Sequence, residues 1–372
     1  MRVALVHDWL LGMRGGEKVL AAIASLYPQA EIYTLLADVS SMPVFQQHRL
    51  HTSWLKHLPG VKSYYRKLLP WMPGAIERFG LKGFDLVISS SHCVAKGVKV
   101  PEGIPHICYC HTPMRYAWDL QDLYLERVPA PLRSWARREL QKLQQWDRVT
   151  SIKVTHFIAN GHTVQRRIRN AYGRESEIIH PPVDTEFYQL DRTVKREEYY
   201  LVVSALAPNK RIELAIEACQ RLKRKLVIIG TGSEAKRLQQ LAGSEVQFLG
   251  WASNETIRQH LQQCQALLFP GEEDFGIVPV EANACGCPVI AYGMGGATET
   301  IRPLGYSDEP TGIWFEQPTK EALIEAILKF ERQRGDIDPE VCRRSAERYS
   351  QARFEKEFSA YCTTVLNSRG LS

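Results

Sequence analysis

Residues 266–291 are Ala-Leu-Leu-Phe-Pro-Gly-Glu-Glu-Asp-Phe-Gly-Ile-Val-Pro-Val-Glu-Ala-Asn-Ala-Cys-Gly-Cys-Pro-Val-Ile-Ala, a pattern that predicts a strand, a polar loop, a helix and a second strand. The apolar run 266–269 is typical of a buried strand in a parallel sheet. Gly276 permits a tight turn, Pro279 suits the first turn of a helix, and Gly286 suits its end. We therefore expect an open α/β sheet whose loops at the carboxyl ends of the strands bind a ligand.

Two glutamates in this segment stand in a Glu-x7-Glu spacing, with Glu273 in the predicted loop and Glu281 in the predicted helix. A helix N-terminus carries unpaired amides and a partial positive charge, so it attracts phosphate. Glu273 could then accept hydrogen bonds from a sugar and Glu281 from a ribose, which is the layout of a nucleotide sugar. The alternative is an acid cluster that stabilises the helix dipole, with a solvated Glu281. The apolar neighbours Val280 and Ala282 favour the nucleotide sugar.

A longer pattern surrounds this pair. Glu273-Asp-Phe-Gly-x4-Glu281, then Ala-x-Ala-Cys-Gly-x-Pro-Val-Ile-Ala, then Gly295-Gly296-Ala-x-Glu299-Thr, resembles the nucleotide-sugar half of the retaining family-four glycosyltransferases. The resemblance implies the GT-B fold, in which two doubly wound, Rossmann-like parallel-sheet domains face each other across a cleft. The donor-binding residues expected in this half are Glu273, Phe275, Gly276, Ile277, Glu281, Gly295 and Gly296.

Composition and charge exclude several classes of protein. The 372 residues suffice for two domains, and 44% of them are hydrophobic. The formal net charge of +6 suits an anionic ligand or membrane surface, but it is weak evidence for nucleic acid, which we do not expect as a partner. No signal segment opens the chain, and no apolar run approaches the ~20 residues of a spanning helix. We therefore expect a cytoplasmic protein.

The sequence gives little reason to expect a metal or a resident cofactor. The nine cysteines include no Cys-x2-Cys pair, so they are interpreted as buried thiols. The one Asp-x-Asp, Asp336 and Asp338, lies in a polar stretch between predicted helices. The expected small molecule is therefore a donor substrate, and no divalent cation is expected.

The N-terminal segment predicts a strand over 2–7 and, after a Gly15-Gly16 pair, a helix. A strand, a glycine pair and a helix allow backbone amides to approach a phosphate, although tight turns use such glycines generally. In the family this loop faces the diphosphate and the acceptor. The resemblance thus places Gly15 and Gly16 near the donor and Glu17 on the acceptor side, and Asp8 is a further candidate there.

Another predicted strand leads into His111-Thr-Pro-Met-Arg115-Tyr-Ala-Trp118-Asp119. A single histidine at a strand end is more often structural than catalytic. As a block, however, this segment resembles the branch of the family that builds bacterial surface polysaccharides, commonly mannosyltransferases. The resemblance implies that His111 contacts the transferred sugar and leaves Arg115 as an acceptor-side or structural cation. It also implies GDP-mannose ahead of UDP-glucose as the donor.

Residues 53–79 interleave five aromatic residues with five basic ones against a single acid. Aromatic rings and basic side chains together suit a peripheral contact with anionic lipid. The equally weighted alternative is a pair of amphipathic helices packed on the core, with a solvated basic face. On the first interpretation this segment would hold the protein at the inner face of the plasma membrane, near a lipid-linked acceptor.

The order of predicted elements gives the domain organisation. The double proline within 178–184 is a stiff connector, and a new alternation of strands and helices follows it. We expect an N-terminal, acceptor-binding domain over 1–180 and a C-terminal, nucleotide-sugar domain over 181–349. The tail is expected to be helical over 343–366, with 350–372 packing back on the first domain.

Lys210 and Arg211 follow the first predicted strand of the second domain, where two cations are well placed for a diphosphate. Family members usually carry an arginine where Ala205 stands, followed by a lysine that matches Lys210. The loss of that arginine weakens the expected stabilisation of the leaving group. Arg211 could replace it, or the protein could be weakly active.

Together with these patterns, the resemblance implies an enzyme that moves a hexose from a nucleoside diphosphate to a lipid-linked or oligosaccharide acceptor with retention of configuration. Bond cleavage places negative charge on the diphosphate, so cations and amides matter more than a strong base. His111, Lys210 and Glu273 are the expected catalytic residues. The alternatives are a sugar-nucleotide epimerase or hydrolase of the same fold, and a nucleotide-binding scaffold without turnover, which Ala205 favours.

Overall fold

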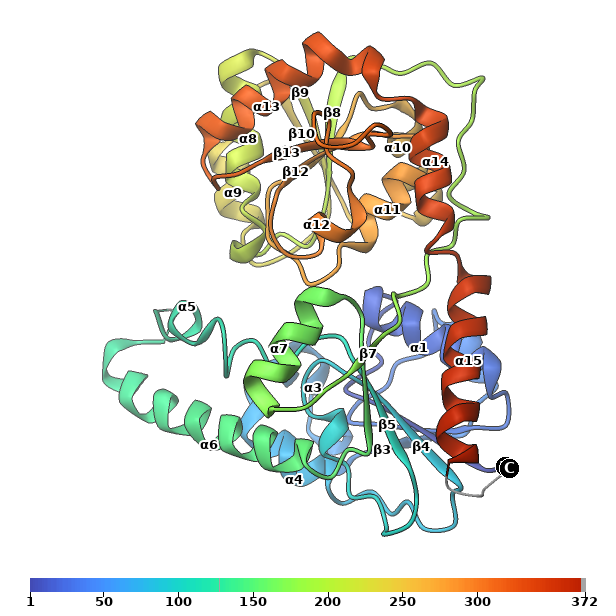
Figure 1. Ribbon diagram of the computed structural model, residues 1–372. Helices are drawn as coiled ribbons and strands as arrows, with labels where there is room; N and C mark the ends of the chain where they lie inside the picture. The colour runs from blue at the N-terminus through green and yellow to red at the C-terminus, as the bar shows by residue number, and fades with distance from the viewer. Residues whose placement is uncertain (127, 369–372) are drawn as a thin grey trace. The chain divides into compact units, whose positions relative to one another are not determined.

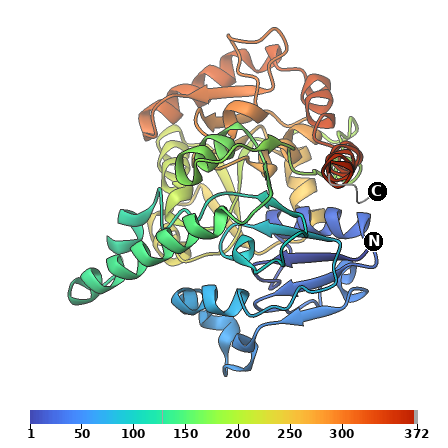
Figure 2. The same ribbon diagram turned by 60° about the horizontal axis from the view of Figure 1, so that its bottom comes forward.

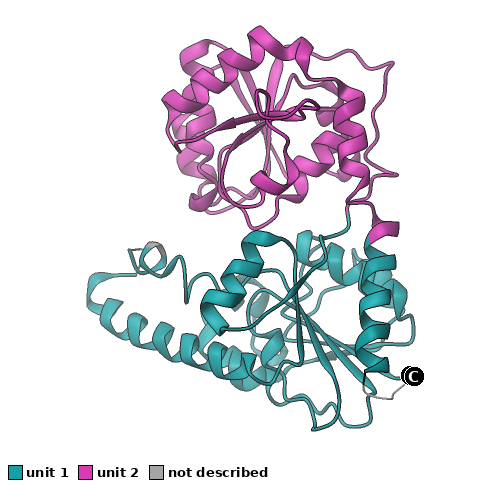
Figure 3. Cartoon of the chain, in the orientation of Figure 1, with its two compact units in different colours: residues 1–182, 354–372 teal, residues 183–353 magenta. Residues whose placement is uncertain are grey.

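The computed structural model describes residues 1–126 and 128–368, and the chain divides into two compact units (Figure 3). Unit 1 consists of Met1–Pro182 together with Phe354–Ser372, and unit 2 is Val183–Arg353. The sequence placed the end of the first domain at 180 and the return of the chain to it at 350. Both positions lie a few residues before the observed ones, 182 and 354. Each unit is built around its own parallel sheet.

Unit 1 contains, within the described residues, a seven-stranded parallel sheet in the order β3-β2-β1-β4-β5-β6-β7 (Figure 1). Its strands are β1 Val3–His7, β2 Glu31–Thr34, β3 Leu50–Thr52, β4 Leu86–Ser91, β5 His106–Cys110, β6 His156–Ala159 and β7 Glu177–Ile178. The central strands are rich in Val, Ile and Leu because helices cover both of their faces.

Side chains of successive strand residues point to opposite faces of this sheet, as the period of two requires. Val3 and Leu5 of β1 belong to the core shared with α1 (Gly15–Leu26). Ala4 and Val6 belong to the core on the other face. The remaining α-helices of this unit before residue 183 are α2 Pro43–Gln46, α3 Val61–Tyr64, α4 Met72–Ile76, α5 Gln121–Glu126, α6 Arg133–Ser151 and α7 His162–Tyr172.

Unit 2 contains, among the residues described, a six-stranded parallel sheet in the order β10-β9-β8-β11-β12-β13. Its strands are β8 Tyr199–Val203, β9 Lys225–Ile229, β10 Val246–Gly250, β11 Leu267–Phe269, β12 Val289–Tyr292 and β13 Gly312–Phe315. Its helices are α8 Ile212–Leu222, α9 Ala235–Leu241, α10 Asn254–Gln263, α11 Ile277–Ala284, α12 Ala297–Thr300, α13 Lys320–Gln333 and α14 Pro339–Glu347. The sheet is thus covered on both faces, and the predicted order strand, loop, helix, strand over 266–291 is observed.

The helical tail is interrupted, which corrects the expectation of helix throughout 343–366. α14 ends at Glu347, and α15 runs over Gln351–Asn367. Between them Ser350 forms a β-bridge with Val183, whose N–H donates to the carbonyl of Tyr349 at 2.8 Å. From Phe354 onward α15 belongs to unit 1 and adds five buried side chains to the core on the α1 face, namely Phe354, Phe358, Cys362, Val365 and Leu366.

The segment 53–79 forms a series of short helical turns. The two amphipathic helices expected on the alternative interpretation are not formed within these described residues. These are the 3-10 turns η1 Trp54–His57 and η2 Tyr65–Trp71, with α3 and α4 beside them. Gly60 has a positive φ of 65° and Pro70 lies inside η2, so neither permits a long helix. No helix among residues 1–126 and 128–368 combines the length and apolar character needed to cross a bilayer.

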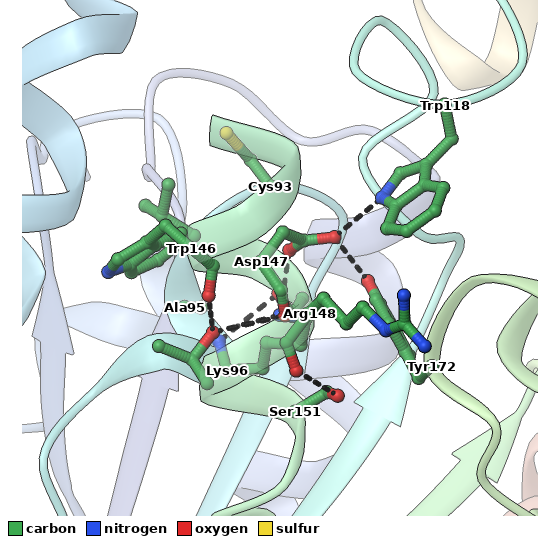
Figure 4. A network of polar contacts seen from close by, with 12 residues as sticks. Cys93, Ala95, Lys96, Trp118, Trp146, Asp147, Arg148, Ser151 and Tyr172 are labelled. Carbon is green, nitrogen blue, oxygen red and sulfur yellow. Dashed lines mark hydrogen bonds and ion pairs between the residues drawn. The ribbon is translucent and has the colours of Figure 1, made fainter. Parts of the chain in front are cut away.

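A buried ion pair holds α6 and the loop after β5 against the sheet (Figure 4). Lys96 Nζ lies 2.7 Å from Asp147 Oδ1, and both side chains are almost completely buried. The other carboxylate oxygen of Asp147 accepts hydrogen bonds from Trp118 Nε1 at 2.9 Å and Tyr172 Oη at 2.7 Å. Lys96 also donates to the Asp147 carbonyl and to Thr150 Oγ1. The network therefore connects the 3-10 turn η3 (Ala95–Gly97), which follows β4, with α6, α7 and the loop that contains Trp118.

Replacing Lys96 by Met should destabilise the chain strongly, because Asp147 would remain buried without its cation. Breaking a buried pair from one side costs about 3–5 kcal/mol, whereas an exposed pair contributes about 0–1 kcal/mol. The matched control is Lys142→Met, which removes the exposed pair with Glu139 on the same helix. Urea unfolding, followed by tryptophan fluorescence, measures both. Equal midpoints for the two variants would contradict a structural role for the buried pair.

Candidate functional site

The charged residues expected in the second domain gather at the carboxyl ends of β8 and β11, which are neighbouring strands. Lys210 ends the 3-10 turn η5 (Pro208–Lys210) after β8, and Glu273 lies in the loop after β11. Lys210 Nζ is 2.6 Å from Glu273 Oε1, and both side chains remain partly exposed, at 20% and 26%. The structure thus brings together two of the three residues expected to be catalytic.

Glycines allow the loops around this pair to approach closely. A side chain at Gly271 would collide with the backbone of Lys210. Gly295 has a positive φ of 66° and forms a β-bridge with Glu273, where a side chain would overlap the Glu273 carbonyl. The next residue, Gly296, donates its N–H to the same carbonyl at 2.8 Å and would overlap Phe275 if it carried a side chain. Close backbone approach is therefore the physical reason for this glycine pair.

α11 begins directly beside these loops. Its N-cap is Gly276, in the left-handed conformation with a φ of 84°, and Ile277 is its first residue. The first amides of a helix lack partners within the helix and favour a negatively charged group. Glu281 lies in the second turn and is 4% exposed. The solvated alternative for Glu281 is therefore wrong, while its contact with a ribose stays a prediction.

Arg211 follows Lys210 with an unusual geometry. It has a positive φ of 51° at the N-cap of α8, and its guanidinium lies over the ring of Tyr292, 5.6 Å from the centroid. One terminal nitrogen is buried without a hydrogen-bond partner. An unsatisfied buried donor is costly unless another group satisfies it. Arg211 therefore has an unused donor close to the Lys210–Glu273 pair in sequence, although no contact joins it to that pair.

The residues expected in the first domain meet in a second cluster, at the carboxyl ends of β1, β4 and β5 in unit 1. His111 Nε2 is 2.8 Å from Ser90 Oγ, and Ser90 Oγ is 3.2 Å from His7 Nδ1. A Cβ atom at Gly16 would lie 3.6 Å from His111 Nε2. The Gly15-Gly16 loop, which forms the first residues of α1, therefore adjoins His111 as the resemblance implied.

Burial and neighbouring charges set the protonation of these groups. Burial lowers the pKa of His111 well below its ordinary value, and the nearby rings of His92 and His7 lower it further. For His7, burial alone would lower the pKa, but the carboxylate of Glu17 more than offsets it and the pKa is raised. The same ion pair, at 3.9 Å, lowers the pKa of Glu17 despite its burial. These effects favour a neutral His111 and a protonated His7 beside an ionised Glu17.

The two acidic residues suggested for the acceptor side have internal partners. The Asp8 carboxylate is completely buried. It accepts hydrogen bonds from the four successive backbone N–H groups of residues 92–95, at 2.8, 3.0, 2.6 and 2.7 Å. Glu17 Oε2 accepts from the N–H of Arg14 at 3.1 Å, and its other oxygen faces His7. Direct contact of either carboxylate with an acceptor finds no support, and both position backbone and side chains of the cluster.

Arg115 lies in the loop that follows His111. Its carbonyl accepts from the N–H of Trp118 at 3.2 Å and from that of Leu120 at 2.7 Å, so the loop is folded into tight turns. Trp118 in turn donates to the buried Asp147. The Arg115 side chain is half-buried, and its acceptor-side role stays a prediction.

Two family models match adjacent parts of the chain. The model described as Glycosyltransferase Family 4 matches residues 14–187, and the model described as Glycosyl transferases group 1 matches residues 186–349. The chain belongs to the family-four glycosyltransferases. This confirms the resemblance drawn from the Glu-x7-Glu segment, and the two parallel-sheet α/β units confirm the GT-B fold class.

Relatives of this glycosyltransferase include enzymes of lipid and inositol glycosylation. It is 31% identical over 181 residues to the D-inositol 3-phosphate glycosyltransferase of Mycobacteroides abscessus, covering 43% of this chain and 40% of the relative. It is 31% identical over 191 residues to the GDP-mannose-dependent alpha-(1-6)-phosphatidylinositol monomannoside mannosyltransferase of Mycolicibacterium smegmatis, covering 43% and 49%. The matches thus span less than half the length of either relative.

The fold also matches a solved structure over nearly its whole length. Anabaena HepE, solved in complex with UDP, aligns with a TM-score of 0.73 at 17% sequence identity, covering 98% of this chain and 100% of HepE. At this identity the comparison shows the fold.

Sequence reasoning missed two members of the unit 1 cluster of this glycosyltransferase, His7 and Ser90. A signal was present, because His7 ends the apolar strand β1 and Ser90 lies in the run of three serines that ends β4. The strand period also places His7, Ser90 and His111 on the same face of the sheet as α1. What the sequence did not provide was the register that pairs His7 with Ser90.

Proposed function

We propose that this chain transfers a hexose, with mannose from GDP-mannose as the favoured donor, to a lipid-linked or saccharide acceptor with retention of configuration. The observation that carries this proposal is the Lys210–Glu273 pair, enclosed by the Gly295-Gly296 loop and the start of α11 at the carboxyl edge of unit 2. The M. smegmatis relative is a GDP-mannose-dependent mannosyltransferase, which supports this donor.

The site is suited to stabilising a diphosphate leaving group. Negative charge develops on the diphosphate as the glycosidic bond breaks, and preorganised cations and amides stabilise it there. We assign this role to Lys210, to the first amides of α11, and to the glycine loops at Gly15-Gly16 and Gly295-Gly296. Retention follows if the acceptor hydroxyl attacks on the side that the phosphate leaves and a phosphate oxygen takes its proton.

The resting ion pair indicates how donor binding would rearrange the site. Lys210 and Glu273 form an ion pair at 2.6 Å. A diphosphate is a stronger partner for Lys210 because it carries more charge. We expect Lys210 to move to the phosphate, which releases Glu273 to accept hydrogen bonds from the sugar hydroxyls. Glu281 then accepts from the ribose, and neutral His111 contacts the transferred sugar.

Contact with a membrane is proposed through segment 53–79. Trp54 and Trp71 are 41% and 57% exposed, and the basic residues Arg66 and Lys67 are exposed as well. Aromatic rings and basic side chains on one exposed segment suit the interface of an anionic bilayer. A second basic surface lies on α6, which Figures 1 and 2 show extending with α5 beyond the strands of unit 1.

The proposed activity is tested with labelled GDP-mannose, GDP-glucose, UDP-glucose and UDP-N-acetylglucosamine, with and without bacterial lipid extract. We expect transfer that depends on the acceptor and a loss of about 100-fold or more in kcat for Glu273→Ala, since one interaction made in the transition state is removed. Glu340→Ala, which removes a surface pair with Arg192, is the control and should leave kcat unchanged. Sugar release without an acceptor would instead support a hydrolase, sugar rearrangement an epimerase, and binding without turnover a scaffold.

Arg211 is expected to supply the charge that Ala205 lacks. Arg211→Ala should weaken GDP binding by about 10-fold or more, because a hydrogen bond to a charged group contributes about 1.5–3 kcal/mol. Lys223→Ala is the control, since Lys223 also has a positive φ and lies at the opposite end of α8. Calorimetric titration with GDP measures both variants, and Ala205→Arg should restore the binding lost in Arg211→Ala. Unchanged binding in Arg211→Ala would support the weakly active alternative.

Membrane contact through segment 53–79 predicts co-sedimentation with vesicles that contain phosphatidylserine and weaker co-sedimentation with phosphatidylcholine alone. Reversing two charges, Arg66→Glu with Lys67→Glu, should reduce binding at least tenfold, at about 1 kcal/mol for each basic residue near the surface. The matched control reverses Arg137 and Arg138 on α6. If only the α6 variant loses vesicle binding, the membrane contact lies on that helix. If vesicle binding does not depend on anionic lipid, both surfaces are excluded.

A further inference from the structure

A row of four side chains crosses the carboxyl edge of the sheet in unit 1. Glu17 of α1 lies 3.9 Å from His7 Nε2, at the end of β1. The other ring nitrogen of His7 is 2.9 Å from the Ser90 carbonyl and 3.2 Å from Ser90 Oγ. Ser90 Oγ is in turn 2.8 Å from His111 Nε2. Three adjacent strands therefore align His7, Ser90 and His111, and α1 places Glu17 beside His7.

The hydrogen-bond partners determine which atoms of this row carry protons. A backbone carbonyl only accepts, so His7 Nδ1 must carry a hydrogen and donate it to Ser90. Glu17 faces the other nitrogen of His7, Nε2, and favours the doubly protonated ring. Such a ring has no acceptor nitrogen, so His7 cannot accept the hydroxyl hydrogen of Ser90. The single hydroxyl hydrogen of Ser90 then has one acceptor among the described residues, which is His111 Nε2.

It follows that His111 is neutral and carries its hydrogen on Nδ1. Its Nε2 accepts from Ser90, so that nitrogen is not available as a base. The alternative tautomer would leave the Ser90 hydroxyl hydrogen buried without an acceptor, which is costly. Burial of His111 and the rings of His7 and His92 oppose a second proton on it. Other charged groups around the row are Asp8, which contacts His92 at 3.1 Å, and Arg66, which acts on His92.

We propose that Ser90 is a positioning residue that, with His7 held by Glu17, fixes His111 as the Nδ1–H tautomer, so that His111 meets the transferred sugar as a hydrogen-bond donor. No described residue accepts a hydrogen bond from His111 Nδ1, so this N–H is free for a ligand. The contact with a sugar rests on the proposed function, whereas the tautomer rests on the contacts in unit 1 alone.

The chain contains a matched control for Ser90. The preceding residue, Ser89, is also buried and forms the same kind of contact, with Ser89 Oγ 2.8 Å from His106 Nε2. Because strand residues alternate, this second Ser–His pair lies on the opposite face of the same two strands. Ser89→Ala therefore removes an equivalent hydrogen bond without touching His111.

The tautomer is tested by NMR spectroscopy of the full chain labelled with 15N-histidine. The variant His111→Gln identifies the signals of His111, because they are missing from its spectrum. We expect a protonated Nδ1 and an unprotonated Nε2 in the wild-type protein, lost in Ser90→Ala and retained in Ser90→Thr and Ser89→Ala. A protonated Nε2 in the wild-type protein would overturn the proposal. This spectrum decides the tautomer even if the chain transfers no sugar, so a failure of the proposed function remains distinguishable.

The consequence for turnover is measured in the same variants. Ser90→Ala should lower kcat about tenfold with little change in KM for the donor, since the donor N–H loses its orientation while the binding groups of unit 2 remain. Ser90→Thr should recover most of the loss, and Ser89→Ala should match the wild-type kcat. Equal losses of kcat in Ser90→Ala and Ser89→Ala would show a general effect of the lost hydrogen bond on folding and would overturn the positioning role.

Discussion

A parallel sheet with helices on both faces leaves its carboxyl edge as the place where charged side chains can meet. Strand interiors in both units are almost entirely apolar and buried. Polar groups therefore appear where the strands end, and neighbouring strands place them side by side. The Lys210–Glu273 pair between β8 and β11, and the row from His7 to His111 across β1, β4 and β5, are two results of this constraint.

The two edges use charge differently. In unit 1 the buried carboxylates of Asp8 and Glu17 accept hydrogen bonds from backbone amides, and Glu17 also faces His7 at 3.9 Å. Such groups are costly to bury unless they are fully bonded, and when bonded they hold one conformation. In unit 2 the Lys210–Glu273 pair is partly exposed, and Arg211 has a buried donor without a partner. The carboxylates of the first edge are therefore fixed by internal bonds, whereas the ion pair of the second edge remains partly exposed.

Glycines allow the loops at the carboxyl edge of the unit 2 sheet to approach each other closely. The loops after β11 and β12 touch through the bridge between Glu273 and Gly295, and any side chain at Gly295 or Gly296 would overlap the neighbouring backbone. The amides of the Gly295-Gly296 loop and the beginning of α11 thereby lie next to a carboxylate and a cation within a few residues. This combination of amides, cation and hydroxyl acceptor matches a sugar diphosphate better than it matches a nucleotide alone.

The sequence by itself determined the class of fold, the boundary near the double proline, and the loop that carries Glu273, because hydrophobic periodicity, glycine and proline act locally. It also indicated Gly15, Gly16 and His111 through their motifs. Tertiary structure alone decided that Asp8 and Glu17 have internal partners, that Lys96 pairs with Asp147 51 positions away in the chain, and that His7 and Ser90 stand beside His111. Those contacts depend on strand register and on the folding back of distant segments, and neither is encoded in the local pattern of residues.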